Sequence, residues 1–318
     1  MERAIELINV SKSYPGVTAL SDVTFSVKKG SVHGFLGPNG AGKSTTMNII
    51  TGLIPPSGGT VKVFGEDVLE HPEKTKRRIG FLPEHAPLYG TMKVEEYLKF
   101  VQAINSLRST VTHDDFDETL ELCGLKDVSH RLIKNLSKGY RQRVAIAQAL
   151  IGRPDIVILD EPTVGLDPTA IVEIRELIYS LREKHTILLS THILHEVNLI
   201  CDHITIINRG RIMNSGPIHE LQSGSEETQL IQAEVMSWRD EIKPILFRDL
   251  PLEDLHVQTK DDFTKLTFKL KGKDDYRAWI SDILVKQNCQ LLGLTKQTVD
   301  VENLFKNATE EEGKGRFQ

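Results

Sequence analysis

The residues from 37 to 45 have the composition and spacing of a phosphate-binding loop. Gly37 and Gly42 bracket four residues and are followed by Lys43 and Ser44. The glycines let the backbone turn tightly and present consecutive N–H groups to phosphate oxygens. Lys43 would reach the β- and γ-phosphates as a point charge, and the Ser44 hydroxyl would complete part of a Mg²⁺ shell. The whole loop consists of Gly37, Pro38, Asn39, Gly40, Ala41, Gly42, Lys43, Ser44 and Thr45.

The residues on either side supply the context that this motif requires. The apolar run from Val32 to Leu36 predicts a strand before the loop, and the residues from Thr46 to Ile50 predict the start of a helix after it. The positive end of that helix dipole would add to the attraction for an anion. A glycine-rich turn with an incidental lysine is the alternative, but it does not account for the order of strand, loop and helix.

Two acids and a histidine follow two further apolar runs. Residues 155–161 predict a buried parallel strand that ends at Asp160 and Glu161, and residues 186–192 predict another that ends at His192. Open α/β sheets bind ligands at this end of their strands. Asp160 would hold a metal through a bound water, and Glu161 would accept a proton from an attacking water. His192 would hydrogen-bond a γ-phosphate, although a lone histidine at a strand end is more often structural or merely exposed.

Two weaker signals leave alternatives open. Ser137 and Gly139 start an amphipathic helix, so Ser137 is either an ordinary N-cap or part of a second phosphate-binding surface. Tyr14 precedes Pro15, which favours an extended backbone and a side chain that projects from a loop. Tyr14 is either a half-buried loop aromatic or a platform on which a purine base stacks. Position alone does not decide between the two.

The elements around these residues predict two domains. The chain has 318 residues, and 39% of them are hydrophobic, which suffices for one large or two smaller cores. Residues 1–221 form the first domain, with a helical insert at about 87–154. A polar linker at 222–227 leads to a second domain at 228–309, where the element order β-α-β-β-α-β predicts a ferredoxin-like α+β unit. That domain ends in a helix at 301–308, and residues 310–318 form a mobile tail.

Charge and composition argue against several classes of protein. The formal charge of -5 lacks the basic field that nucleic-acid binding usually leaves, so we do not expect a nucleic acid as partner. Three widely spaced cysteines predict free thiols in a reducing compartment. The N-terminus lacks the apolar core of a secretory signal, and the most apolar long window, residues 185–208, is interrupted by acidic residues and histidines. Any membrane-spanning part therefore belongs to another chain.

In this order the motifs resemble those of the ATP-binding subunit of ABC transporters. The resemblance rests on the phosphate loop, the signature at 136–140, the Walker B run at 156–161, the D-loop at 165–167 and the switch at 190–192. It covers residues 5–221, and the downstream part looks like the accessory domain of some exporter ATPases. It implies an α/β P-loop ATPase domain with a parallel core sheet, an antiparallel β subdomain and a helical subdomain, followed by the α+β accessory domain.

The resemblance also implies a site and partners. A homodimer, or a pair of such ATPase subunits, would close head to tail on Mg-ATP and drive a separate multi-span permease for export, from the cytoplasmic face of the cell membrane. The loop at Glu84, with residues 86–89, would face that permease. The implied roles are nucleotide binding for Tyr14, Ser137, Gly139 and Asp167, magnesium binding for Ser44, Glu84 and Asp160, and catalysis for Glu161 and His192.

Three residues depart from the usual family pattern. The family most often has Gln in place of Glu84, Gly in place of Lys138 and Gln in place of Tyr140. Lys138 either places a cation beside the γ-phosphate or points outward. These variants look like the exporter branch that moves drugs, sodium, polysaccharide or gliding-motility components.

Two alternatives concern the whole chain and its second domain. A soluble ABC protein that acts on ribosomes or DNA would tend to carry two cassettes or a long coiled coil, whereas this chain has one cassette and no long heptad run. The accessory domain is either a regulatory module or a cap that stabilises the dimer. The lack of a polar constellation in its sequence favours the cap.

Overall fold

The computed structural model describes residues 2–106, 113–222, 228–259, 263–272 and 274–297. The chain divides into two compact units, Met1–Pro217 and Ile218–Gln318. The predicted boundary after Leu221 falls inside a short helix, α8 (Ile218–Gln222). The remainder of the predicted linker, the helix predicted at 301–308 and the predicted tail lie outside the described residues.

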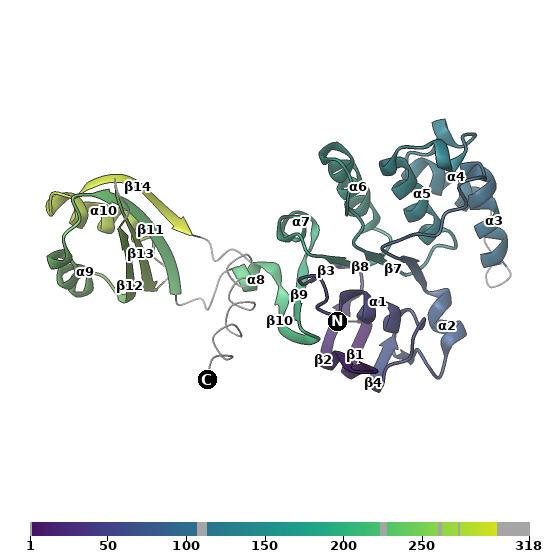
Figure 1. Cartoon of the computed structure of the whole chain (residues 1–318), viewed down its shortest axis with the longest axis horizontal. Coiled ribbons are helices and arrows are strands. Elements are labelled where there is room, and N and C mark those ends of the chain that lie inside the picture. Colours follow the sequence, from purple (N-terminus) through teal and green to yellow (C-terminus); the bar gives the residue numbers. More distant parts are fainter. Residues whose placement is uncertain (1, 107–112, 223–227, 260–262, 273, 298–318) are drawn as a thin grey trace. The chain divides into compact units, whose positions relative to one another are not determined.

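A six-stranded sheet forms the centre of the first unit (Figure 1). Its strand order is β10-β9-β3-β8-β7-β6. The strands are β3 (Val32–Leu36), β6 (Ile79–Leu82), β7 (Ile156–Asp160), β8 (Thr186–Thr191), β9 (His203–Asn208) and β10 (Arg211–Pro217). All neighbours pair in parallel except β9 and β10, which form an antiparallel hairpin. The segments that follow β3, β7 and β8 therefore meet at one edge of the sheet.

The central strands are apolar because both faces of the sheet are covered. On β7, Ile156 and Ile158 belong to one hydrophobic core, whereas Val157 and Leu159 belong to the other. A parallel strand buried on both faces reads as a continuous apolar run rather than an alternating one. This packing holds the end of β7, where Asp160 lies, in a rigid position.

An antiparallel sheet covers one face, with α1 (Lys43–Ile50) between the two sheets (Figure 1). Its order is β2-β1-β4-β5, with β1 (Arg3–Tyr14), β2 (Val17–Lys28), β4 (Gly58–Val63) and β5 (Glu66–Asp67). The prediction that Tyr14 projects from a loop is wrong. Tyr14 is the last residue of β1 and pairs with Val17 of β2, because the chain reverses within Pro15 and Gly16.

Helices cover the other face of the central sheet. They include α5 (Lys138–Leu150), α6 (Pro168–Leu181) and α7 (Leu194–Ile200), and the segment predicted as a helical insert contains α3 (Val94–Ser106), α4 (His113–Leu122) and α5. A short helix, α2 (Pro72–Arg77), precedes β6. Val144, Ile146 and Leu150 of α5 are buried in this core. The second half of α5 is therefore held against the sheet by its own apolar face, whereas residues 138–143 at its start are exposed or half-buried.

The second unit has the predicted element order. It contains β11 (Thr228–Met236), α9 (Lys243–Asp249), β12 (Leu252–Thr259), β13 (Thr264–Lys271), α10 (Arg277–Lys286) and β14 (Gln290–Gln297), in an antiparallel sheet of order β12-β13-β11-β14. Both helices pack on one face of this sheet (Figure 1). The first helix starts at Lys243 rather than at the predicted Trp238, because Pro244 favours the first turn of a helix.

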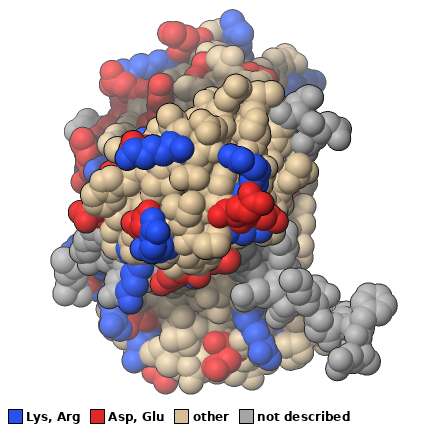
Figure 2. Space-filling view, turned by 90° about the vertical axis from the view of Figure 1, so that its left-hand side faces the viewer, with Lys and Arg blue, Asp and Glu red and all other residues tan. Residues whose placement is uncertain are grey.

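The surface of the second unit carries ion pairs between neighbouring residues. Arg248 contacts Asp249 at 2.7 Å, and Arg277 contacts Asp275 at 2.6 Å. In the view of Figure 2, basic and acidic side chains lie close to one another rather than in separate areas. Exposed pairs of this kind contribute about 0–1 kcal/mol each, so the apolar core holds this unit together.

Candidate active site

The phosphate loop joins β3 to α1 at the edge where the parallel strands end. Gly37 N donates to Thr191 O at 3.3 Å, which ties the start of the loop to the end of β8. A Cβ at residue 37 would lie 2.5 Å from Ile207 O, so only glycine fits there. Gly42 caps α1 with a φ of 107°, which residues with a Cβ rarely adopt. The helix therefore begins at Lys43, three residues before the predicted start at Thr46.

The ammonium group of Lys43 is buried and fully partnered. Lys43 Nζ donates to Gly37 O at 2.9 Å and to Pro38 O at 3.3 Å. It also lies 3.0 Å from Glu161 Oε1, and both side chains are only 6% exposed. Lysine is almost never buried without such partners. The loop carbonyls and the carboxylate thus hold this cation over the loop.

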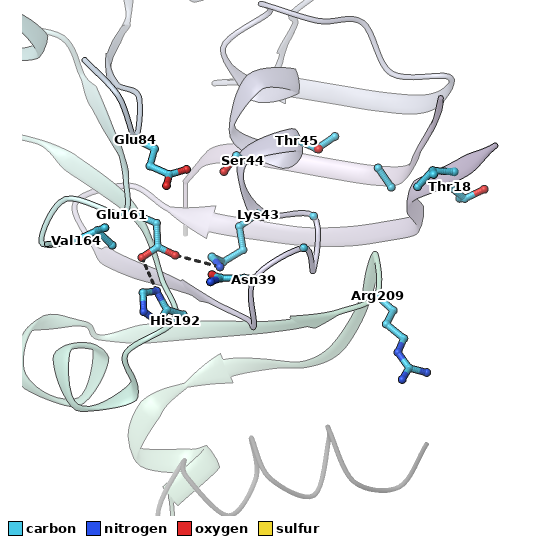
Figure 3. Close-up of a pocket in the computed structure, with 14 residues that line it drawn as sticks. Thr18, Asn39, Lys43, Ser44, Thr45, Glu84, Glu161, Val164, His192 and Arg209 are labelled. Carbon is cyan, nitrogen blue, oxygen red and sulfur yellow. Dashed lines mark hydrogen bonds and ion pairs between the residues drawn. The ribbon is translucent and has the colours of Figure 1, made fainter. Parts of the chain in front are cut away.

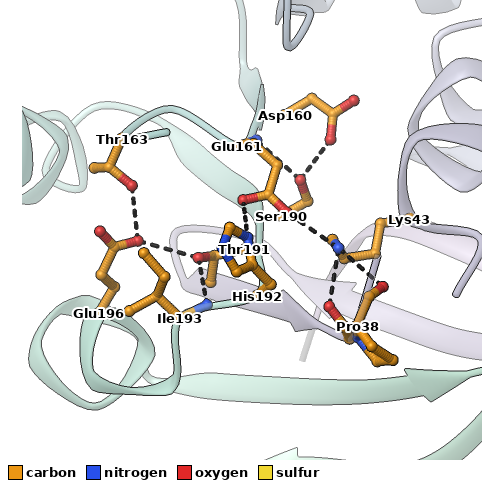
Figure 4. A network of polar contacts seen from close by, with 11 residues as sticks. Pro38, Lys43, Asp160, Glu161, Thr163, Ser190, Thr191, His192, Ile193 and Glu196 are labelled. Carbon is orange, nitrogen blue, oxygen red and sulfur yellow. Dashed lines mark hydrogen bonds and ion pairs between the residues drawn. The ribbon is translucent and has the colours of Figure 1, made fainter. Parts of the chain in front are cut away.

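Glu161 adopts a backbone conformation that separates its side chain from that of Asp160. Its φ is 49°, in the left-handed region. Its backbone N–H donates to Ser190 Oγ at 3.0 Å, which helps to hold this turn. A left-handed residue other than glycine costs about 1–2 kcal/mol, and such residues concentrate at functional sites. The turn directs the Glu161 carboxylate toward Lys43 and His192 (Figure 4).

The predicted switch histidine contacts the predicted base. His192 Nδ1 lies 2.9 Å from Glu161 Oε2, and the His192 side chain is 39% exposed. Lys43 occupies the other oxygen of the same carboxylate. Three residues from three separate segments of the sequence therefore form one connected set.

The residues predicted to serve magnesium lie on the other side of this strand end. Ser190 Oγ donates to Asp160 Oδ1 at 2.5 Å. Burial raises the pKa of Asp160, hydrogen bonds from Ser190 and Ser44 lower it, and the charges of Glu84 and Glu161 raise it further. A hydroxyl beside carboxylates that repel one another suits a hard divalent cation, which takes oxygen ligands and neutralises their charge. The described residues contain no cluster of three or more His, Cys, Asp or Glu placed for a metal.

A cavity of about 630 Å³ brings most of the predicted residues together (Figure 3). This volume is within the range of small-molecule sites. One end is lined by Glu84, Glu161 and His192, and the middle by the phosphate loop. The residues that line it and were not predicted are Val17, Thr18, Ala19, Val164 and Arg209.

Eight predicted residues do not line this cavity. Gly37, Pro38, Ala41 and Asp160 lie in the segments that carry its lining residues, whereas Tyr14, Ser137, Gly139 and Asp167 belong to other segments. Ser137 caps α5 and accepts from Tyr140 N at 3.3 Å, and Gly139 follows it on the helix. Asp167 caps α6 and accepts from Ala170 N at 3.1 Å. Tyr14 is 45% exposed at the end of β1. Within one chain, Ser137 and Asp167 thus serve as helix caps.

The variant lysine of the signature segment approaches the D-loop of its own chain. A Cβ built on Gly165 would lie 2.2 Å from Lys138 Nζ. Four residues further along α5, Gln142 Nε2 donates to Pro162 O at 2.8 Å. The start of α5 and the segment after Glu161 are therefore connected within one chain.

Glu196, a buried acid to which the sequence analysis gave no role, connects Thr163, which precedes the D-loop, to Thr191 of the switch segment. Glu196 is 3% exposed, and its Oε2 accepts from Thr163 Oγ1 at 2.8 Å and from Thr191 Oγ1 at 3.1 Å (Figure 4). Thr191 Oγ1 in turn accepts from Ile193 N at 3.0 Å. An acid among the apolar residues of α7, four residues after His192, is the signal that could have indicated this position.

Comparison with known proteins gives the same family that the sequence motifs resemble. A family model described as ABC transporter matches residues 20–164. The chain is 33% identical to the linearmycin resistance ATP-binding protein LnrL of Bacillus subtilis (strain 168), over 95% of this chain and 96% of that protein. It is 37% identical to the bacitracin transport ATP-binding protein BcrA of Bacillus licheniformis, over 70% of this chain and 72% of that protein. A bacterial ABC transporter cassette solved as a dimer has 28% identity and a TM-score of 0.61, covering 67% of this chain and 98% of that one.

The chain belongs to the ATP-binding proteins of ABC transporters, and it is an ATPase. The predicted family, fold class and enzyme class are confirmed. Another similar structure, with 26% identity and a TM-score of 0.63, is cbiO1 of Clostridium perfringens, which is part of an ABC transporter complex. Among the described residues, no helix is long and apolar enough to span a membrane.

Proposed function

We propose that this chain hydrolyses Mg-ATP in a head-to-tail dimer and thereby drives export through a separate multi-span subunit. The contact of Lys43, Glu161 and His192 in one cavity beside the phosphate loop carries this proposal. The relatives named for linearmycin resistance and bacitracin transport support export. The proposed place of the chain is peripheral, on the cytoplasmic face of the cell membrane.

The geometry suggests how binding prepares the reaction. A triphosphate on the loop amides would compete with Glu161 for the ammonium group of Lys43. Glu161 would then be free to accept a proton from the attacking water, with His192 on its other oxygen to orient it. Ser44 and Asp160, with Glu84 nearby, would hold the Mg²⁺, which supplies neutralisation of the phosphate charge.

A second copy would complete the site. Ser137 and Gly139 lie at the start of α5, where a helix N-terminus suits an anion, yet they do not line the cavity of their own chain. We assign them to the γ-phosphate bound by the partner, with Asp167 coupling the two sites. Tyr14 would stack on adenine, because its strand partner Val17 lines the cavity.

The transmembrane subunit would dock beside Glu84. A second cavity, of about 350 Å³, is lined by Phe81, Pro87, Tyr89, Phe100 and Ile104 among others. Tyr89, Phe100 and Ile104 are each more than 40% exposed. Exposed aromatic and apolar side chains around a hollow are typical of protein interaction sites. This position lets the nucleotide cavity and the docking surface share the segment that carries Glu84.

Glu161→Gln tests the proposed chemistry. It should abolish turnover, retain ATP binding and stabilise a nucleotide-bound dimer, because the amide keeps the shape of the carboxylate but cannot act as the base. Phosphate release and size-exclusion chromatography with ATP measure the two effects. Glu176→Gln, an exposed change on α6, is the control. Normal phosphate release by Glu161→Gln would refute the base assignment.

Purification of the tagged chain from solubilised membranes tests the partner. Recovery of a multi-span protein supports transport. Recovery of ribosomal RNA instead would support the alternative of a soluble protein acting on ribosomes.

A further inference from the structure

Arg209 lines the nucleotide cavity, and none of the motifs described above gives it a role. Glu161 and His192 lie at one end of the cavity, and Thr18 and Arg209 lie at the other (Figure 3). The phosphate loop, with Lys43, lies between these two ends. Arg209 comes from the turn between β9 and β10, far in sequence from the loop.

Backbone contacts hold this turn against the phosphate loop. Gly210 N donates to Ala41 O at 2.9 Å, and Ser21 N donates to Gly210 O at 2.8 Å. A Cβ at residue 210 would lie 2.4 Å from Ala19 O, so the turn packs directly on β2. The Cα of Arg209 is therefore placed as firmly as the loop itself.

The turn also contains an arginine where its backbone favours other residues. Arg209 and Gly210 have φ values of 46° and 75°, which define a two-residue hairpin of type I′. Asn, Asp and Gly are preferred at the first of these positions, because other residues are strained at positive φ. The arginine is thus not explained by the turn, and a strained residue at a cavity points to a role there.

The extended shape of a nucleotide indicates what that role is. A nucleotide with its terminal phosphate near Glu161 and its phosphate chain on the loop would extend its ribose and base toward the end of the cavity where Thr18 and Arg209 lie. A guanidinium group can pack on the face of a purine and donate to ribose oxygens. Lys43, the cation at the phosphate end, is already committed to the loop carbonyls and Glu161.

We propose that Arg209 is a binding residue for the ribose and base of the nucleotide. This inference rests on the proposed nucleotide site and adds a contact that recognises the nucleoside rather than the phosphates. It predicts that the residue matters for ATP and is irrelevant for a ligand that has only the phosphate chain.

Arg209→Asn tests this proposal with little risk to the fold, because asparagine suits the first position of the turn. Calorimetric binding of ATP and of inorganic triphosphate is compared in the full chain. ATP should bind about 5-fold more weakly, in the range of a cation–π contact at a partly exposed site, and inorganic triphosphate should bind unchanged. Arg211→Gln, an exposed change two residues on, is the matched control and should alter neither affinity.

Two outcomes would overturn the assignment. An equal loss for ATP and inorganic triphosphate would show that Arg209 acts on the phosphates, and unchanged ATP binding would show that it makes no contact. If the unmodified chain binds neither ligand, the proposed nucleotide site itself fails, which is a distinguishable result. Unfolding of Arg209→Asn at or above the wild-type temperature excludes loss of the fold as the cause.

Discussion

The carboxylate of Glu161 lies 3.0 Å from the ammonium group of Lys43, and protein surrounds both. The proposed base and the proposed phosphate ligand thus neutralise each other within the loop. A bound triphosphate would replace Glu161 as the partner of Lys43, so binding and activation of the base are linked through one contact.

Removal of one member of this pair should lower both binding and stability. Lys43→Ala should lose nucleotide binding, and it should destabilise the fold by about 3 kcal/mol because it leaves a buried carboxylate without its cation. The double variant Lys43→Ala with Glu161→Gln should regain part of that stability but no binding. Urea unfolding and a nucleotide-binding assay measure the two effects. Unchanged affinity of Lys43→Ala would remove the phosphate-loop interpretation.

The charge of Glu84 should strengthen the hold on magnesium. Glu84 lines the cavity, and its charge acts on Asp160. Glu84→Gln should raise the Mg²⁺ concentration for half-maximal ATP hydrolysis several-fold, because one carboxylate near the metal is lost. A magnesium titration of the ATPase rate checks this, with Glu73→Gln on α2 as the control. An identical magnesium requirement would show that Glu84 does not serve the metal.

The buried Glu196 should position the switch segment. Glu196→Ala would leave the hydroxyls of Thr163 and Thr191 without their acceptor, so we expect a loss of about 1–3 kcal/mol in the free energy of unfolding. Glu196→Gln keeps an acceptor oxygen and should restore most of this stability. Denaturant unfolding of both variants gives the comparison. Equal stability of the alanine variant and the wild type would contradict the assignment.

Acid should destabilise the first unit through His33 on β3. Burial, together with the nearby His203, lowers the pKa of His33 from 6.5 to about 3. Its folded pKa lies below its unfolded value, so the stability it contributes is present above pH 6.5 and is lost as the pH falls toward 3. Between pH 7 and pH 5 this amounts to about 2 kcal/mol. Urea unfolding at pH 7 and at pH 5 should show this loss in the free energy of unfolding, and the loss should be smaller in His33→Gln. An equal loss in that variant would exclude His33 as its source.

Local patterns in the sequence were enough to identify the ends of the central strands. The loop from 37 to 45, the acids at 160 and 161 and the histidine at 192 each follow an apolar run, and a parallel sheet brings such ends to one edge. The order of elements in the second unit was also predicted, because its alternating strands and amphipathic helices are short-range patterns. Boundaries were less accurate: β1 continues to Tyr14, because the chain reverses within two residues.

The contacts themselves depended on the tertiary structure. Lys43 meets Glu161 only because β3 and β7 both pair with β8, and Arg209 reaches the cavity only because the turn after β9 packs on the loop. Glu196 reads in sequence as a solvated helix acid, yet packing of α7 buries it beside two threonine hydroxyls. Sequence motifs give the types of residues, their order and their local spacing. Which atoms touch depends on strand register and helix packing, and these are settled by contacts between segments that local spacing does not relate.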